Sequence, residues 1–116
     1  MEIVGYEVDE AGSSLLYGGS LNMFFITGLR IKKDDITGSR TFGYYHTYEE
    51  AEEDVFANNL DIHEHYYNYM VIEQIEEGLY RHPLGEWFFE WDENSNKYIK
   101  TLKPLCLSHY VNFSIG

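Results

Sequence analysis

The sequence contains little cysteine and little positive charge. A single cysteine, Cys106, stands among 116 residues, so an intramolecular disulfide is impossible and a disulfide-stabilised secreted scaffold is excluded. Only 8 lysine and arginine residues accompany 20 acidic residues, which gives a formal net charge of −12. Direct binding of nucleic acid is not expected, because the basic groove that it requires is missing.

Long apolar runs and leader-like segments are also lacking. The most apolar segment, LNMFFITGL, is far shorter than a membrane span. The opening segment MEIVGYEVDE has neither the basic start nor the apolar stretch of a signal peptide. We therefore expect a soluble, cytoplasmic protein that does not contact a membrane.

Recognised catalytic and metal-binding motifs are missing as well. The sequence has no Walker loop, GxGxxG, nucleophile elbow, HExxH or paired CxxC. Segment 92–103 begins like a calcium loop, but Lys97 and Lys103 occupy the positions that require glycine and glutamate. These absences favour a non-enzymatic protein without a cofactor.

Two histidines in the stretch DIHEHYYNYMVIE are the best candidates for a metal site. On a strand, alternate residues point the same way, so His63 and His65 could share one metal ion. Asp61 or Glu64 would complete such a set, with His46 or His109 brought in by the fold, but no third ligand stands at a recognised spacing. The same histidines are more simply explained as capping or solvated residues between a helix and a strand. A metalloprotein or enzyme that uses this pair is therefore the third functional hypothesis.

The abundant residues indicate one largely aromatic core. Hydrophobic residues make up 44% of the chain and aromatic residues 17%, which suits one domain over residues 1–116. The predicted strands cover residues 2–8, 21–31, 40–46, 66–75, 86–92 and 97–102, and the predicted helix covers 47–59. This order predicts an α+β fold with a mainly antiparallel sheet.

The connections and the tail are less regular. Segment 32–40 is expected to form a charged turn, and Gly43 marks a bulge or a close-packing point in the next strand. After residue 103, Pro104 suits the first turn of a short helix, although Val111 and Phe113 would also alternate in a strand. Cys106 lies among apolar neighbours and is expected to be a small core residue.

The helix is the clearest predicted element. Thr47 and Glu50 have the spacing of a capping box, in which the threonine hydroxyl accepts from a first-turn amide and the glutamate reaches back to the Thr47 amide. Asn58 and Asn59 are expected to end the helix, because asparagine tolerates the left-handed conformation. The predicted buried stripe consists of Tyr48, Ala51 and Val55.

Two strands are expected to carry most of the aromatic core. Segment 66–75 has bulk on both faces, which predicts a central strand. One of its faces is predicted to hold Tyr67, Tyr69, Val71 and Ile75, and the other Met70 and Ile72. Segment 86–92 is expected to place Trp87, Phe89 and Trp91 on one face, in a hairpin closed by the polar turn DENSN.

Negative charge is concentrated in the middle of the chain. Residues 44–93 hold 14 of the 20 acids and one of the 8 bases. A dense acidic face can imitate the phosphate backbone and occupy the basic channel of a nucleic-acid enzyme. The first hypothesis is therefore a small, non-enzymatic protein that inhibits a basic partner; the alternative is a solvated surface. The predicted partner-binding residues are Glu49, Glu50, Glu52, Glu53, Asp54, Glu73, Glu76 and Glu77.

The second hypothesis is a small-ligand binder, for example one that sequesters nucleotides. Aromatic side chains would line a pocket, and a basic cluster would reach an anionic group of the ligand. The candidate residues are Tyr67, Tyr69, Trp87, Trp91, Arg30 and Arg40. A homo-oligomer is compatible with any of these hypotheses.

Several stretches together resemble one group of small proteins. The run FGYYHTYEEAEEDVFANNLDIHEHYYNYMVIEQIEEGLY, the later WFFEWDENSNKYIK and the ending VNFSIG are similar to small uncharacterised proteins of Firmicutes, their phages and mobile elements. The likeness covers roughly the last two thirds of the chain and implies a phage or mobile-element setting in a bacterial host cell. Small acidic proteins of that setting often inhibit host defence, which makes a defence nuclease the expected partner in the first hypothesis.

Overall fold

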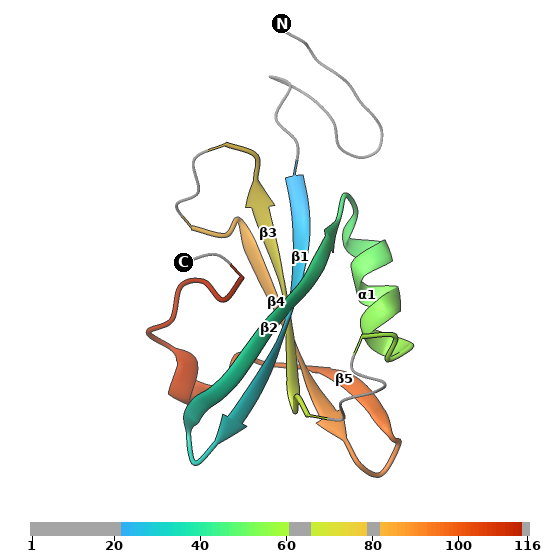
Figure 1. Ribbon diagram of the computed structural model, residues 1–116, viewed down its shortest axis with the longest axis vertical. Helices are drawn as coiled ribbons and strands as arrows, with labels where there is room; N and C mark the ends of the chain where they lie inside the picture. The colour runs from blue at the N-terminus through green and yellow to red at the C-terminus, as the bar shows by residue number, and fades with distance from the viewer. Residues whose placement is uncertain (1–21, 61–65, 79–81, 115–116) are drawn as a thin grey trace, which may run out of the picture.

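The computed structural model describes residues 22–60, 66–78 and 82–114, which form one antiparallel sheet and one α-helix (Figure 1). The elements are β1 (Asn22–Lys32), β2 (Asp35–Tyr45), α1 (Tyr48–Phe56), β3 (Tyr69–Glu76), β4 (Gly85–Asp92), β5 (Lys97–Thr101) and a 3₁₀ helix (Leu105–Leu107). The strands follow the order β2-β1-β3-β4-β5, and each neighbouring pair is antiparallel. The predicted α+β fold and the central position of β3 are confirmed, whereas the predicted strand at 2–8 lies outside the described residues.

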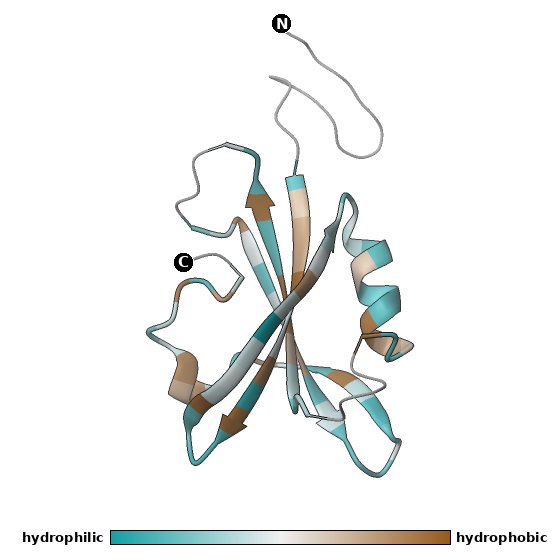
Figure 2. Ribbon diagram, in the orientation of Figure 1, coloured by the Kyte–Doolittle hydropathy of each residue, from teal (hydrophilic) through white to brown (hydrophobic). Residues whose placement is uncertain are grey.

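The two faces of the sheet are covered by different parts of the chain (Figure 1). α1 packs on one face, and hydrophilic residues run along most of its length (Figure 2). The buried side chains between α1 and that face include Ile26, Val55, Met70, Ile72 and Phe89. The segment after β5 covers the other face. Its buried cluster consists of Leu29, Val71, Phe88 and Leu107. The sheet therefore has two apolar layers, one closed by the helix and one closed by the C-terminal segment.

The ends of α1 follow local sequence signals. The Thr47 hydroxyl accepts from the Glu50 amide at 3.3 Å, which confirms the predicted N-cap. The Glu50 carboxylate accepts from the Thr47 hydroxyl at 3.0 Å instead of reaching the Thr47 amide, so the capping box is formed only in part. Asn58 follows the helix with a φ of 54°, which confirms the predicted left-handed stop.

The connection between β1 and β2 is shorter than predicted. A charged turn over 32–40 is wrong, because β2 already begins at Asp35. Lys33 and Asp34 make the turn with φ values of 54° and 66°, and such a left-handed pair matches the twist of a two-residue hairpin. The polar residues that follow remain exposed because β2 is the outermost described strand on its side of the sheet. Gly43, with a φ of 152°, lies at a register shift and confirms the predicted bulge.

The start of β3 also differs from the prediction. β3 begins at Tyr69 and not at residue 66. Tyr67 packs with the α1-side core, whereas Tyr69 packs on the opposite face, so their predicted common face is wrong. The alternation of faces holds only inside a strand, and Tyr67 lies before it. Trp87, Phe89 and Trp91 do share the α1 side, as predicted.

The C-terminal segment confirms the short helix and not the strand. Leu105–Leu107 forms a 3₁₀ helix with Pro104 at its N-cap, and residues 108–114 contain no strand. Cys106 is half-buried and packs against the cluster on this face, in agreement with a core role. None of the helices in the described ranges has the length and apolar character that crossing a membrane requires.

Candidate functional site

A pocket of about 320 Å³ opens at the end of the sheet where β1 and β4 finish and β3 and β5 begin. Four aromatic rings, three asparagines, one cation and one acid contribute to it. The lining residues are Arg30, Asn58, Tyr66, Tyr67, Asn68, Trp91, Glu93, Asn96 and Tyr98. Arg30 belongs to β1, Asn58 follows α1, residues 66–68 directly precede β3, and the remaining residues belong to the β4–β5 hairpin. The site is therefore built by the fold from segments that are far apart in sequence.

Tyr67 is held firmly in the pocket wall. Its carbonyl accepts from the buried hydroxyl of Tyr98 at 2.5 Å, and its ring meets Phe42 edge-on with 5.7 Å between centroids. The ring lies directly on Gly28, where a Cβ would stand 2.8 Å from the Tyr67 Cγ. A glycine at this position of β1 is what allows the ring to approach the sheet so closely.

Asn68 joins the approach of β3 to the end of β1. Its side-chain Oδ1 accepts from the Ile31 amide and its Nδ2 donates to the Ile31 carbonyl, both at 2.8 Å. The Asn68 side-chain amide thus forms with Ile31 the two hydrogen bonds that the backbone of a neighbouring strand would otherwise form. On the other side, the Asn68 carbonyl accepts from the Trp91 amide at 3.0 Å. These contacts fix the positions of β1 and β4 around the pocket.

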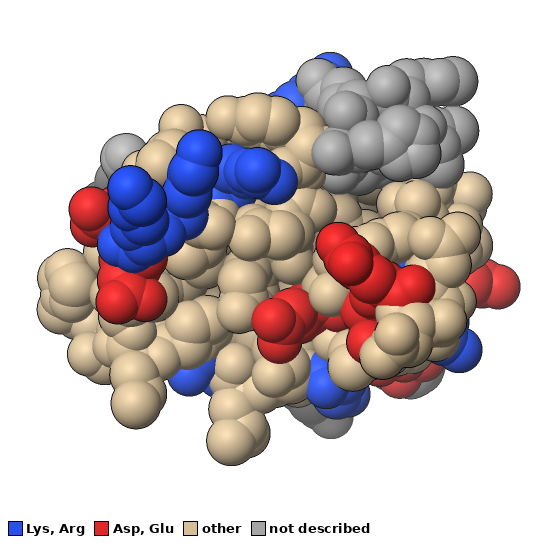
Figure 3. Space-filling model, turned by 90° about the horizontal axis from the view of Figure 1, so that it is seen from below, with Lys and Arg blue, Asp and Glu red and all other residues tan. Residues whose placement is uncertain are grey.

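Arg30 supplies the positive charge of the pocket. It donates from one guanidinium nitrogen to the Tyr66 carbonyl at 3.1 Å and lies 5.4 Å from the centroid of the Tyr66 ring. Within the described ranges, no carboxylate forms an ion pair with it. Lys32 and Lys33 are exposed nearby on the β1–β2 hairpin, and Figure 3 shows basic side chains gathered at one side of this end of the molecule.

Glu93 and Asn96 stand on the opposite side of the pocket, in the β4–β5 turn. Asp92 fixes this turn by accepting from the Ser95 amide at 3.0 Å and the Ser95 hydroxyl at 2.6 Å. These hydrogen bonds, led by the hydroxyl, hold the pKa of Asp92 below its ordinary value. Asp92 is thus engaged within the turn, whereas Glu93 is exposed and lines the pocket. Figure 3 shows acidic side chains both beside the basic group and on a separate part of this end of the molecule.

Three of the six residues predicted for ligand binding meet in this pocket, namely Arg30, Tyr67 and Trp91. The other three lie elsewhere. Tyr69 is on the opposite face, Trp87 packs 4.7 Å from the Tyr48 ring, and Arg40 lies over the Phe42 ring at 5.3 Å. Sequence reasoning missed Asn58, Tyr66, Asn68, Glu93, Asn96 and Tyr98. The turn signal of DENSN was the one local feature that pointed toward two of them.

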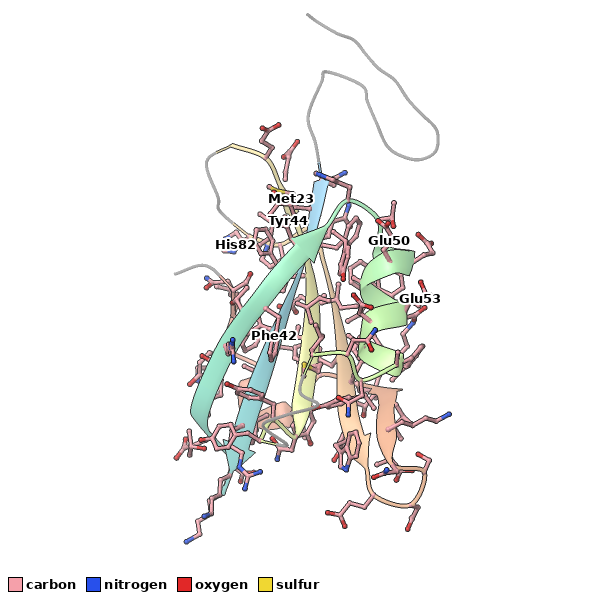
Figure 4. All side chains as sticks on the ribbon, turned by 45° about the vertical axis from the view of Figure 1, so that its right-hand side comes forward. Met23, Phe42, Tyr44, Glu50, Glu53 and His82 are labelled. Atoms are coloured by element: carbon pink, nitrogen blue, oxygen red, sulfur yellow. The ribbon has the colours of Figure 1, made fainter. Side chains whose placement is uncertain are left out.

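The acids of α1 do not act as one free surface. Glu52 accepts from the Tyr48 hydroxyl at 2.8 Å and pairs with Lys100 at 3.3 Å. Asp54 accepts from the hydroxyl of Tyr45 and from the amide of Asn59. Figure 4 shows Glu50 and Glu53 pointing away from the sheet. The exposed acids of the helix are Glu49, Glu50 and Glu53.

Glu73 lies on the opposite side of the sheet from the acids of α1 and has a different role. It is fully buried on the face covered by the C-terminal segment. Its carboxylate accepts from the Phe113 amide and the Ser114 amide, each at 2.9 Å, and from the Ser114 hydroxyl at 2.7 Å. Burial raises the pKa of Glu73 above its ordinary value, against the opposing effect of these donors. It therefore fastens the C-terminal segment and does not belong to an exposed acidic face.

The last two acids of the predicted set are exposed at the end of β3. Glu76 lies opposite Asn22 in the β1–β3 ladder, and Glu77 follows the strand.

A further acid, Glu86, lies directly opposite Glu73 in the β3–β4 ladder and forms an ion pair with Lys103 at 3.2 Å. The eight predicted partner-binding acids are thus divided among the helix surface, internal contacts and the end of a strand.

The histidine pair that suggested a metal site, His63 and His65, lies outside the described residues. Among the residues that the structure does describe, no group of three or more histidine, cysteine, aspartate or glutamate side chains could hold a metal ion. Comparison with known proteins adds no functional assignment: no family model, no curated protein and no solved structure matches this chain.

Proposed function

We propose that this protein binds a small anionic ligand with an aromatic ring, of the nucleotide type, in the pocket at the end of the sheet. One observation carries the proposal: the guanidinium of Arg30 lies at the pocket wall and forms no ion pair with a described carboxylate. Acids outnumber bases by 20 to 8 in this chain, yet among the described residues the Arg30 guanidinium has no carboxylate partner that would compete with an anionic ligand.

The surroundings of Arg30 support the same ligand chemistry. A guanidinium offers five donors in a fixed fork, which matches a phosphate or carboxylate. Only one contact from its nitrogens, to the Tyr66 carbonyl, engages it in the described structure. Trp91 and the neighbouring tyrosines provide apolar surface for a planar ring. A ligand with both features would use the aromatic wall for affinity and the cation for orientation.

The experiment is a calorimetric titration with AMP, GMP, CMP, UMP and phenyl phosphate. We expect saturable binding of at least one of these ligands to the wild-type protein. Arg30→Gln should weaken that binding about tenfold or more, because a charge-assisted hydrogen bond is lost. Lys32→Gln is the matched control, since it removes one charge at the same end without touching the pocket lining, and it should change affinity about twofold or less. Absence of binding, or equal effects of the two substitutions, would contradict the proposal.

The acidic-surface hypothesis keeps narrower support. Of the helical acids predicted to bind a partner, Glu49, Glu50 and Glu53 are exposed. The other two, Glu52 and Asp54, have partners within the protein. Inhibition of a basic, nucleic-acid-binding host protein such as a defence nuclease stays a prediction from sequence charge and resemblance. In the phage or mobile-element setting, sequestration of a nucleotide by the pocket would be an equally direct way to act on a host.

A further inference from the structure

Resting on the proposed function, we infer that the ligand is a ribonucleoside monophosphate, with its phosphate at Arg30, its base on the aromatic wall and its sugar hydroxyls at Glu93. The inference starts from the two opposite charges in the pocket. Arg30 and Glu93 line the same space but form no ion pair with each other. The space between them is therefore available to a ligand that is negative at one end and rich in hydrogen-bond donors at the other.

The acid selects against ligands that are negative throughout. A carboxylate at the pocket wall repels a second phosphate, and it accepts hydrogen bonds without donating any. Vicinal sugar hydroxyls provide two donors side by side, and an acidic side chain is the usual partner for ribose hydroxyls in nucleotide sites. Asn96, on the same turn as Glu93, adds an amide that both donates and accepts. This wall suits a sugar better than a phosphate or a purely apolar group.

The size of the pocket sets the upper limit of the ligand. Ligand sites commonly measure about 300–1,000 Å³, and this one, at about 320 Å³, is at the lower end of the range. One base, one sugar and one phosphate suit that volume, whereas a dinucleotide does not. Trp91 is half-buried, and its ring meets the buried Tyr98 ring edge-on with centroids 5.0 Å apart, so the Trp91 ring is held in place as a wall for the base.

The turn that carries Glu93 is already fixed without a ligand. Asp92 binds Ser95 through two hydrogen bonds, and Asn96 holds a left-handed φ of 59° and donates its amide to the Asp92 carbonyl at 2.7 Å. A preformed wall lowers the entropy lost on binding. The backbone that carries Glu93 is therefore held at the pocket wall before a ligand binds.

A double comparison tests the role of Glu93. The best-binding ribonucleoside monophosphate and its 2′,3′-dideoxy analogue are titrated into the wild-type protein, Glu93→Gln and the control Glu77→Gln, which changes an exposed acid outside the pocket. In the wild type and the control, loss of the hydroxyls should weaken binding about tenfold. In Glu93→Gln, the same loss should cost about threefold or less, because the charged acceptor is already gone.

The alternative results separate the inference from the proposed function. An equal cost of hydroxyl removal in all three proteins would overturn the role of Glu93, while Arg30-dependent binding would still support the pocket. Binding of phenyl phosphate without binding of any of the four nucleotides would likewise overturn the inference alone. Binding of none of these ligands would overturn both. Glu93 is exposed, and circular dichroism should show that each variant remains folded.

Discussion

The pocket and the acidic residues of the middle segment are assembled in opposite ways. Pocket residues are scattered from Arg30 to Tyr98 in the sequence, and the strand ends bring them within one space of about 320 Å³. The acids gather within one half of the sequence, five of them between Glu49 and Asp54, and the fold disperses them. Glu52 is paired with Lys100, and Glu73 is buried on the opposite side of the sheet from α1.

The difference shows what creates a binding site in this molecule. Charge density along the chain is a property of the sequence, but each acid acquires its role from its neighbours in space. Glu73 acts within the structure, whereas Glu53 faces solvent, although both belong to the same acidic segment. The Arg30 guanidinium, in contrast, has no carboxylate partner among the described residues.

The largest expected effect distinguishes the buried acid from an exposed one. Glu73→Ala should lower the free energy of unfolding by about 2–4 kcal/mol, because it leaves the amides of Phe113 and Ser114 without an acceptor and opens a cavity. Glu76→Ala, at an exposed position three residues on, should change it by about 0.5 kcal/mol or less. Urea denaturation of both variants measures the difference. Equal losses would show that Glu73 does not fasten the C-terminal segment.

The next effect concerns the glycines under the aromatic wall. Gly28→Ala would place a Cβ 2.8 Å from the Tyr67 Cγ, and overpacking of this kind costs about 1–3 kcal/mol and should displace the ring. Gly38→Ala meets the outer edge of the Tyr66 ring at 2.9 Å, where the ring can swing away, so its cost should be smaller. Thermal unfolding and calorimetric titration should show that Gly28→Ala loses more stability and more ligand affinity than Gly38→Ala does. A larger loss in Gly38→Ala would contradict this view of the pocket wall.

A smaller effect is the pH dependence that Glu73 contributes. Burial raises its pKa above the ordinary value of 4.5, so the unfolded chain releases this proton at lower pH than the folded protein does. The contribution of Glu73 is therefore fully present below the unfolded pKa and is lost as pH rises through the folded pKa. Compared with Glu73→Gln, the wild type should become less stable with rising pH above about 4.5. Urea denaturation over that range checks the slope, and the opposite slope would contradict the dominance of burial.

The smallest effect is expected for the exposed helical acids. The triple variant Glu49→Gln, Glu50→Gln and Glu53→Gln should change unfolding free energy by about 1 kcal/mol or less, because these side chains face solvent. If the acidic surface binds a basic partner, pull-down from host lysate should recover that partner at low salt, and both high salt and the triple variant should abolish recovery. A partner that the triple variant still retains at high salt would contradict the electrostatic explanation.

Elements with local causes could be predicted from the sequence. The N-cap at Thr47, the stop at Asn58 and the alternation of Trp87, Phe89 and Trp91 depend on neighbours within a few residues, and the structure has each of them. The early start of β2 was missed because residues 35–40 are mostly polar and lie on an outer strand, where alternation of apolar residues is weak.

The pocket and the role of Glu73 depend on distant neighbours. Glu73 is bound by residues 40 and 41 positions later in the chain, and no local pattern predicts that contact. Tyr67 took the unexpected side because it lies before the strand and fits over Gly28. The residue types of a ligand pocket could be anticipated from the sequence, but their convergence required the order of the strands.

The most direct test of the account is an NMR titration of the isotope-labelled protein with the tightest of the four ribonucleoside monophosphates. We expect saturable shifts that are largest at the Trp91 indole N–H and at the backbone amides of Arg30 and Asn96, with little change at Glu49 or Glu53. Arg30→Gln should reduce these shifts at equal ligand concentration. No saturable shift, or largest shifts along α1, would contradict the pocket as the functional site of this protein.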